Sequence, residues 1–272
     1  MKWRRVVPML IVFGIMTLVF WSREGMAGTL QDVKARGVLI AGVRTDLVPF
    51  GFLDAKGMNR GFDVDIAHVL AKALFGKEDA VQFVPVTRSN GRDFLNEKKI
   101  DVLLGGLTPE SHQRGVDNSI PYFESGYLIL ARDDSKIARY QDLAGKNVAT
   151  ILDSTADSAL RELVPQANRV VFKRHSEALD ALKDRRVDAF VDTALIIIHF
   201  QRRNPKLKIA GFQPFGSVSY GIGVREKDEE WLGFVNATLA KMKETGQHEK
   251  LSEKWFAEAM ALLLGFEKPA KK

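Results

Sequence analysis

Short apolar runs alternate with amphipathic helical patterns along most of the chain, and this alternation limits the possible folds more than any other feature. Residues 38–43 and 81–86 have the length and the β-branched content of buried strands. Between them, residues 62–75 repeat apolar side chains at helical spacing, so that Ile66 and Leu70 share one face. Strands that alternate with helices are typical of an α/β protein with largely parallel sheets.

The same reading extends to the end of the chain and predicts two lobes. Two extended segments, 125–127 and 215–219, are each flanked by turn residues, and they predict two crossings that allow hinge closure. Lobe 1 then comprises residues 28–125 plus 217–272, and lobe 2 comprises residues 126–216. Further strands are predicted at 101–104, 127–131, 148–152, 170–172 and 188–191, and further helices at 93–98, 156–163, 177–183, 194–201 and 231–244.

Residues 1–27 form a separate unit. Three positive charges lie within the first five residues, residues 6–21 carry no charge, and the small residues Gly25 and Ala27 follow. This order is typical of a secretory signal peptide cleaved after Ala27, and it predicts export to the periplasm. A retained membrane anchor is the alternative, although sixteen uncharged residues are short for a span of about 20.

Composition narrows the class of protein further. The chain has no cysteine, which excludes disulfides, a thiolate metal site, a cysteine nucleophile and a lipid-modified cysteine at the cleavage site. The formal net charge is +6, and the leader carries half of it. In the remainder, acidic and basic residues alternate and do not cluster with aromatics, so no nucleic-acid partner is expected.

Two glycines and a helix start follow the strand predicted at 101–104. Gly105 and Gly106 would let a ligand approach the backbone closely. Thr108 suits a helix N-cap and Pro109 the first helical position. The free N–H groups there could hold a carboxylate, and an ordinary capped helix is an equally good explanation of this segment alone.

Polar residues follow two other predicted strands. Ser154 and Thr155 come after 148–152, and either can cap the next helix. Asp192 comes directly after 188–191, where a buried carboxylate is costly unless an arginine, a helix cap or a ligand ammonium pairs with it. Ligands of open α/β sheets bind at the carboxyl ends of strands, so two helix starts and one carboxylate predict a site for a zwitterion.

The sequence offers little for catalysis. The five histidines are scattered, without a pair at metal-ligand spacing. Neither a G-x-S-x-G nucleophile motif nor a phosphate-binding loop is present. His112 is the only candidate general base near the predicted site, and a place on a surface helix explains it better. We therefore expect a binding protein that is not an enzyme and that needs no cofactor and no metal.

Motifs spread over nearly the whole chain after residue 27 carry a family resemblance. They are GVLIAGV at 37–43, PFGF at 49–52, GFDVDIA at 61–67, VDNSIPYF at 116–123, DLAGKNV at 142–148, YGIGVR at 220–225 and KWF at 254–256. In this order and spacing the sequence resembles bacterial family 3 extracellular solute-binding proteins, the polar-amino-acid-binding components of ABC importers. The resemblance implies the two-lobed periplasmic-binding-protein fold of type II, with mixed, mainly parallel sheets flanked by helices and two hinge crossovers.

The resemblance also implies a site and partners. A ligand carboxylate would meet Thr108 and the Gly106 region in lobe 1 and Thr155, beside Ser154, in lobe 2, whereas Asp192 would meet its ammonium. Phe50 of the PFGF motif would line the site. The protein would be a monomer that closes on a small molecule, an amino acid or an organic anion, and delivers it to the membrane permease of an ABC importer.

Departures from the family pattern bear on the ligand. Relatives usually carry an arginine soon after the threonine, but here Arg114 is out of register, and Asp192 comes one residue early. Arg44 stands where some binders of cationic amino acids are acidic, and Arg92 follows an inserted glycine. Arg44, Arg92 and Arg114 together favour an acidic or neutral polar ligand over a cationic one.

Two other functions stay open at this point. A few relatives of this kind are dehydratases that act on prephenate or arogenate, but they need a positioned acid. Residues 217–220, the stretch considered for that acid, read SVSY and contain no carboxylate. The third possibility is an accessory protein that senses its ligand and reports to a membrane partner.

Overall fold

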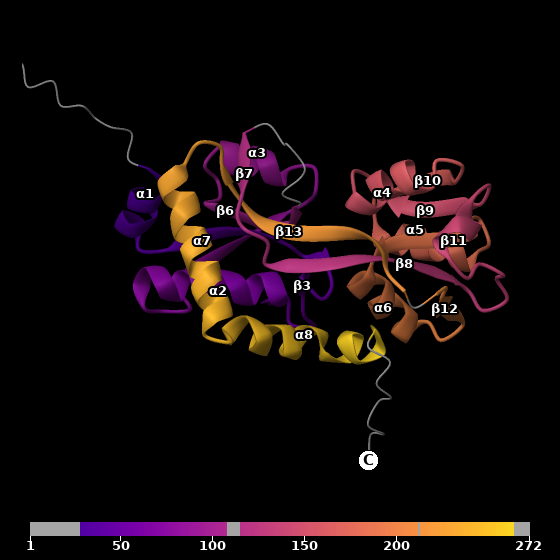
Figure 1. Ribbon diagram of the computed structural model, residues 1–272. Coiled ribbons are helices and arrows are strands. Elements are labelled where there is room, and N and C mark those ends of the chain that lie inside the picture. The colour runs from indigo at the N-terminus through magenta and orange to yellow at the C-terminus, as the bar shows by residue number, and fades with distance from the viewer. Residues whose placement is uncertain (1–27, 108–114, 212, 264–272) are drawn as a thin grey trace, which may run out of the picture.

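The computed structural model describes residues 28–107, 115–211 and 213–263, and it has two α/β lobes side by side (Figure 1). The helices are α1 (Thr29–Arg36), α2 (Phe62–Phe75), α3 (Gly91–Asn96), α4 (Thr155–Leu163), α5 (His175–Lys183), α6 (Ala194–Arg203), α7 (Glu229–Glu244) and α8 (Gln247–Leu263). The strands are β1 (Leu39–Arg44), β2 (Asp46–Leu47), β3 (Gly51–Leu53), β4 (Asn59–Arg60), β5 (Val81–Val86), β6 (Val102–Leu107), β7 (Val116–Asn118), β8 (Phe123–Arg132), β9 (Asn147–Ile151), β10 (Asn168–Phe172), β11 (Ala189–Thr193), β12 (Leu207–Ile209) and β13 (Phe215–Arg225).

Each lobe is built on a mixed sheet whose central strands run parallel. In lobe 1 the order is β5-β1-β6-β13, and β1 is parallel to both β5 and β6. In lobe 2 the order is β10-β9-β11-β8, and β9 is parallel to both β10 and β11. Helices flank both sheets (Figure 1). The predicted α/β class is therefore confirmed.

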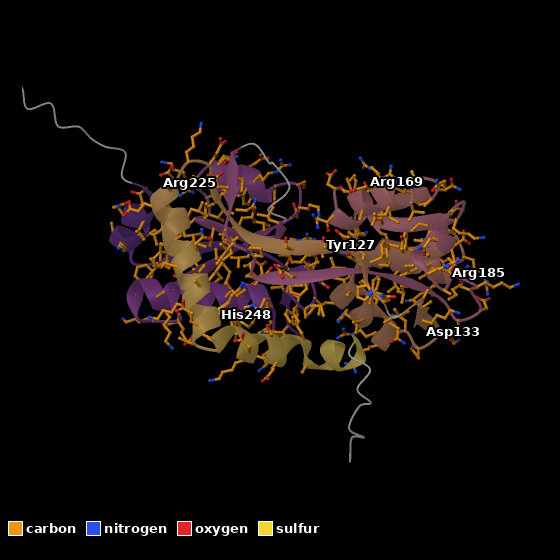
Figure 2. The ribbon with its side chains drawn as sticks, viewed as in Figure 1. Tyr127, Asp133, Arg169, Arg185, Arg225 and His248 are labelled. Carbon is orange, nitrogen blue, oxygen red and sulfur yellow. The ribbon has the colours of Figure 1, made fainter. Side chains whose placement is uncertain are left out.

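The long strands β8 and β13 join the lobes. They pair antiparallel with each other from Phe215 opposite Tyr127 to Tyr220 opposite Phe123. Each strand also pairs with one lobe's own sheet, β13 with β6 and β8 with β11. Tyr127 lies near the middle of the molecule (Figure 2), with its ring centroid 5.9 Å from that of Phe215. The two predicted crossings thus lie on these strands. The predicted lobe boundaries at 125/126 and 216/217 fall inside them and stay a prediction.

Apolar side chains on the helices and strands form the core. In α2, Ile66 and Leu70 are fully buried on the face that packs against the sheet of lobe 1. Trp231 of α7 is also fully buried, and its indole N–H donates to the Asp101 carbonyl over 2.9 Å. Across the described part of the chain, no helix combines the length and the apolar character that a membrane span needs.

One carboxylate is buried inside lobe 1 without a charged partner in direct contact. Asp63, in the first turn of α2, has no exposed surface. Its Oδ1 accepts a 2.9 Å hydrogen bond from the Tyr122 hydroxyl, while Oδ2 has no hydrogen-bond partner. Burial raises the pKa of Asp63 to about 7, although the Tyr122 hydrogen bond and the charge of Arg44 act in the opposite direction.

We predict that Asp63 makes stability fall as pH rises. The unfolded carboxyl titrates near 3.8 and the folded one near 7, so the folded state holds a proton that the unfolded state has released. This stabilisation is complete below the lower value, declines between the two, and is lost above the higher one. Urea unfolding of Asp63→Asn at several pH values should show a shallower decline than wild type. The difference should reach a few kcal/mol, because one pKa unit corresponds to about 1.4 kcal/mol. Parallel curves for the two proteins would contradict the assignment.

Candidate ligand-binding site

The carboxyl ends of parallel strands from the two lobes meet at the junction between them. Strand β5 leads into Arg88 and strand β9 leads into Asp153, and Arg88 Nη1 donates to the Asp153 carbonyl over 3.2 Å. Asp46, just after β1, is close enough to His175, after β10, for the imidazole charge to act on its pKa. Ligands of open α/β sheets bind at such strand ends, so this junction is the candidate site.

Lobe 1 contributes Arg44, the last residue of β1. Its side chain is buried, and Nε donates to Asp46 Oδ1 over 2.7 Å, while Nη1 has no hydrogen-bond partner. Burial disfavours the Asp46 carboxylate, but the hydrogen bond and charge of Arg44, aided by the charge of His175, outweigh it and lower the pKa of Asp46. Gly105 makes room for Arg44, since a Cβ at Gly105 would lie 2.8 Å from Arg44 Cγ.

Arg88 is the second cation from lobe 1. Its Nε atom has no exposed surface and no hydrogen-bond partner. Burial lowers the pKa of Arg88, and the like charge of Arg44 lowers it further, whereas Tyr220, Asp192 and Asp153 act in the opposite direction. The guanidinium remains a cation at neutral pH all the same. The charges of Arg44 and Asp192 thus both act on Arg88.

Lobe 2 contributes Asp192, which lies within β11 rather than after it. The carboxylate is buried, and its Oδ1 accepts a 2.7 Å hydrogen bond from the Thr193 N–H. His175 Nε2 lies 3.1 Å from Oδ2, but without the alignment of a hydrogen bond, so Oδ2 has no hydrogen-bond partner. A buried oxygen of this kind is costly unless a ligand donor reaches it.

The start of α4 lies beside Arg88. Ser154 is its N-cap, and Ser154 Oγ accepts a 3.1 Å hydrogen bond from the Asp157 N–H. Thr155 and Ala156 occupy the first two helical positions, whose N–H groups an α-helix leaves without internal partners. The predicted helix cap is therefore present, and the positive end of α4 lies at the candidate site.

Of the remaining predicted site residues, two are buried, one is exposed, and two lie outside the described residues. Gly106 has a φ of +75°, and a Cβ there would lie 3.4 Å from the ring of Tyr220. Phe50 is fully buried in an aromatic cluster, with ring centroids 4.9 Å from Phe123 and 5.3 Å from Tyr220. Arg92 is exposed on α3. Thr108 and Arg114 lie outside the described residues.

Sequence reasoning missed Arg88 and His175. Both come shortly after parallel strands, β5 and β10, which is the criterion that selected Asp192 and Thr155. The predicted strands at 81–86 and 170–172 therefore held enough information to nominate them.

Taken together, the junction offers cationic donors at Arg44 and Arg88, a carboxylate acceptor at Asp192 and the positive end of α4. Among the residues that the structure describes, no cluster of three or more histidine, aspartate or glutamate side chains could hold a metal ion. This set of groups suits a small molecule that carries both negative and positive charge.

Comparison with known proteins shows both the fold class and the family of this chain. The class is that of two-lobed binding proteins with the type II periplasmic fold, as in a mutant of ArgBP from T. maritima. That structure matches with a TM-score of 0.75 and 36% identity, over 84% of this chain and 99% of the other. Residues 39–258 match the model of bacterial extracellular solute-binding proteins, family 3, and the chain belongs to this family.

Two further proteins are similar to this chain. The glutamine-binding protein of an ABC transporter from Bacillus subtilis (strain 168) is 32% identical over 240 residues, which cover 87% of this chain and 88% of the relative. The ancestral amino acid-binding protein AncCDT-1, a precursor of cyclohexadienyl dehydratase, matches with a TM-score of 0.75 and 33% identity. That match covers 85% of this chain and the whole of the other.

We predict that Gly105→Ala destabilises the protein and displaces Arg44. Gly105 has a φ of +152°, where a side chain is strained by about 1–3 kcal/mol, and the new Cβ would press on Arg44 Cγ. Gly57→Ala is the control, since Gly57 also has a positive φ but has nothing within 4 Å of an added Cβ. Urea unfolding should show the larger loss for Gly105→Ala. Equal losses would mean that contact with Arg44 is unimportant.

Proposed function

We propose that this protein is the receptor of an ABC importer, and that it binds an amino acid or a related organic anion between its lobes. One observation carries the proposal: buried polar atoms that make no hydrogen bond lie at the junction on both lobes. They are Arg44 Nη1 and Arg88 Nε in lobe 1 and Asp192 Oδ2 in lobe 2. Family membership and the names of relatives support the same function.

The balance of charge favours an acidic ligand over a cationic one. An acidic amino acid has two carboxylates, which Arg88 and the free Nη1 of Arg44 could hold, and one ammonium, which Asp192 could hold; Asp46 already pairs with Nε of Arg44. A cationic amino acid would bring a second positive group towards Arg44 or Arg88, and like charges held together cost several kcal/mol. Of the arginines that suggested this preference in the sequence, Arg44 is buried at the junction, whereas Arg92 is exposed on α3. Arg88 takes its place.

Binding without turnover is part of the proposal. The groups at the junction are suited to holding charges, and Arg44 and Arg88 are cations that cannot serve as general bases. Of the described junction groups that could move a proton, His175 and Asp192 are in contact with each other, and Asp46 is paired with Arg44. The dehydratase alternative is supported mainly by the name of one relative, the precursor AncCDT-1.

We predict that the protein binds L-glutamate or L-aspartate about 100-fold or more tightly than L-arginine or L-lysine. Isothermal titration calorimetry should give the affinities, and the ligand should be recovered unaltered from the unfolded complex. A ligand at 100 times its Kd should also add about 2.7 kcal/mol of stability in a thermal-shift assay. Tight binding of arginine, with no response to acidic amino acids, would refute the charge argument.

The variant Arg44→Gln should abolish most of the preference for L-glutamate over L-arginine, because it removes one of the two cations. Arg60→Gln serves as the control, since the Arg60 side chain is 60% exposed and pairs with Asp54 on the surface. If Arg44→Gln keeps the wild-type ratio of affinities, Arg44 does not contact the ligand.

The place of action follows from the N-terminus and the family. We propose that residues 1–27 direct export and are removed, so that the mature receptor works in the periplasm beside its permease. The description of the family as extracellular supports this location.

We predict that the exported protein begins at Gly28. Expression of the full chain in a Gram-negative host, followed by mass spectrometry of the periplasmic fraction, should show loss of residues 1–27. Export without shortening would mean that the leader is retained as an anchor.

A further inference from the structure

The loop that carries Arg88 is held in place by its own hydrogen bonds. The Thr87 N–H donates to Asn90 Oδ1 over 2.7 Å, and the Asn90 N–H donates to Thr87 Oγ1 over 3.2 Å. The Gly91 N–H, at the start of α3, donates to the Thr87 carbonyl over 3.2 Å. Arg88 therefore extends towards lobe 2 from a fixed base between β5 and α3.

Its partner in lobe 2 has an unusual backbone conformation. Asp153 has a φ of +56°, in the left-handed region that few residues other than glycine adopt. In this conformation the Asp153 carbonyl accepts the hydrogen bond from Arg88 Nη1. Ser154, the next residue, caps α4. The contact thus joins the end of a lobe 1 strand to the start of a lobe 2 helix.

The hydrogen bond to Asp153 leaves another donor of the Arg88 guanidinium without a partner. Nε and Nη2 form another edge of the Arg88 guanidinium, on the side away from Nη1. Arginine commonly binds a carboxylate along this edge. Nε is buried without a partner. The like charge of Arg44 is close by, and the N-terminal end of α4 is also positive. Both repel the guanidinium, and the charges of Asp192 and Asp153 act in the opposite direction. A ligand carboxylate on Nε would supply the hydrogen-bond acceptor that this buried atom lacks.

We propose that Arg88 is the clamp that makes lobe closure depend on an anionic ligand. One edge of its guanidinium holds the Asp153 carbonyl of lobe 2, and the other holds a carboxylate of the ligand, which also neutralises the repulsion from Arg44 and from α4. This inference rests on the proposed function and assigns one of its binding residues.

The experiment compares wild type with Arg88→Met, Arg88→Lys and the control Arg186→Met. Arg186 is in lobe 2, and its side chain is 58% exposed beside Asp184. Affinity for L-glutamate is measured by calorimetry and dissociation by stopped flow. Closure is measured by energy transfer between dyes on Lys77→Cys in lobe 1 and Glu162→Cys in lobe 2, since the chain has no other cysteine.

Arg88→Met should weaken glutamate binding by about 10- to 100-fold, the usual range for a lost charged hydrogen bond. Most of that loss should be faster dissociation, with a smaller closed fraction at saturation. Arg88→Lys keeps a positive charge without the planar edge and should recover part of both. Arg186→Met should match wild type.

Three results would overturn the clamp. If Arg88→Met binds, dissociates and closes like wild type, the proposed function stands and the clamp does not. If Arg88→Met or Arg88→Lys only lowers the melting temperature of the ligand-free protein, Arg88 is structural. If wild type binds no amino acid and no organic acid, the proposed function itself fails and the clamp fails with it.

Discussion

The antiparallel pairing of β8 with β13 is the constraint on which the rest of the structure depends. These strands belong to the sheets of both lobes, so they set how the carboxyl ends of one lobe's strands face those of the other. The pairing is irregular between Phe215 and Val218, where the register shifts. Such irregularity bends a strand pair locally, at the place where the chain passes from one lobe to the other. Two strands at one junction can bend together and bring two otherwise rigid lobes closer.

The charged side chains at the junction are only partly paired. Arg44 has a hydrogen-bond partner for Nε but none for Nη1, and Asp192 has one for Oδ1, whereas its Oδ2 has only the contact with His175. Unpaired groups of this kind destabilise a buried interface. They are tolerated at functional sites because a bound molecule supplies what is missing. In the proposed function, closure and recognition would be one event, since the lobes would gain most from meeting with a ligand of matching charge between them.

Local pattern predicted much of the fold and less of the site. Helix α2 and strand β5 were predicted with the bounds that the structure has, because apolar spacing within each segment determines them. Strand β8 was predicted as 127–131 but spans Phe123–Arg132, because polar residues at its start pair with β13. Helices α1 and α8 and the short strands β2–β4, β7 and β12 were not predicted. The short elements have too few residues to carry a periodic signal. Predicted site residues Thr108 and Arg114 lie outside the described part of the chain.

By itself the sequence determined the class of fold, the two crossings, the family and the strand ends at which polar residues gather, because each of these follows from local spacing or from ordered motifs. The tertiary structure alone decided which of those residues meet. Whether Arg44 is buried while Arg92 is exposed depends on which way each side chain faces after packing. That Arg88 reaches Asp153 depends on two lobes whose strand ends lie far apart in sequence. Side-chain direction and contact across a hinge are properties of the assembled molecule, and no local pattern encodes them.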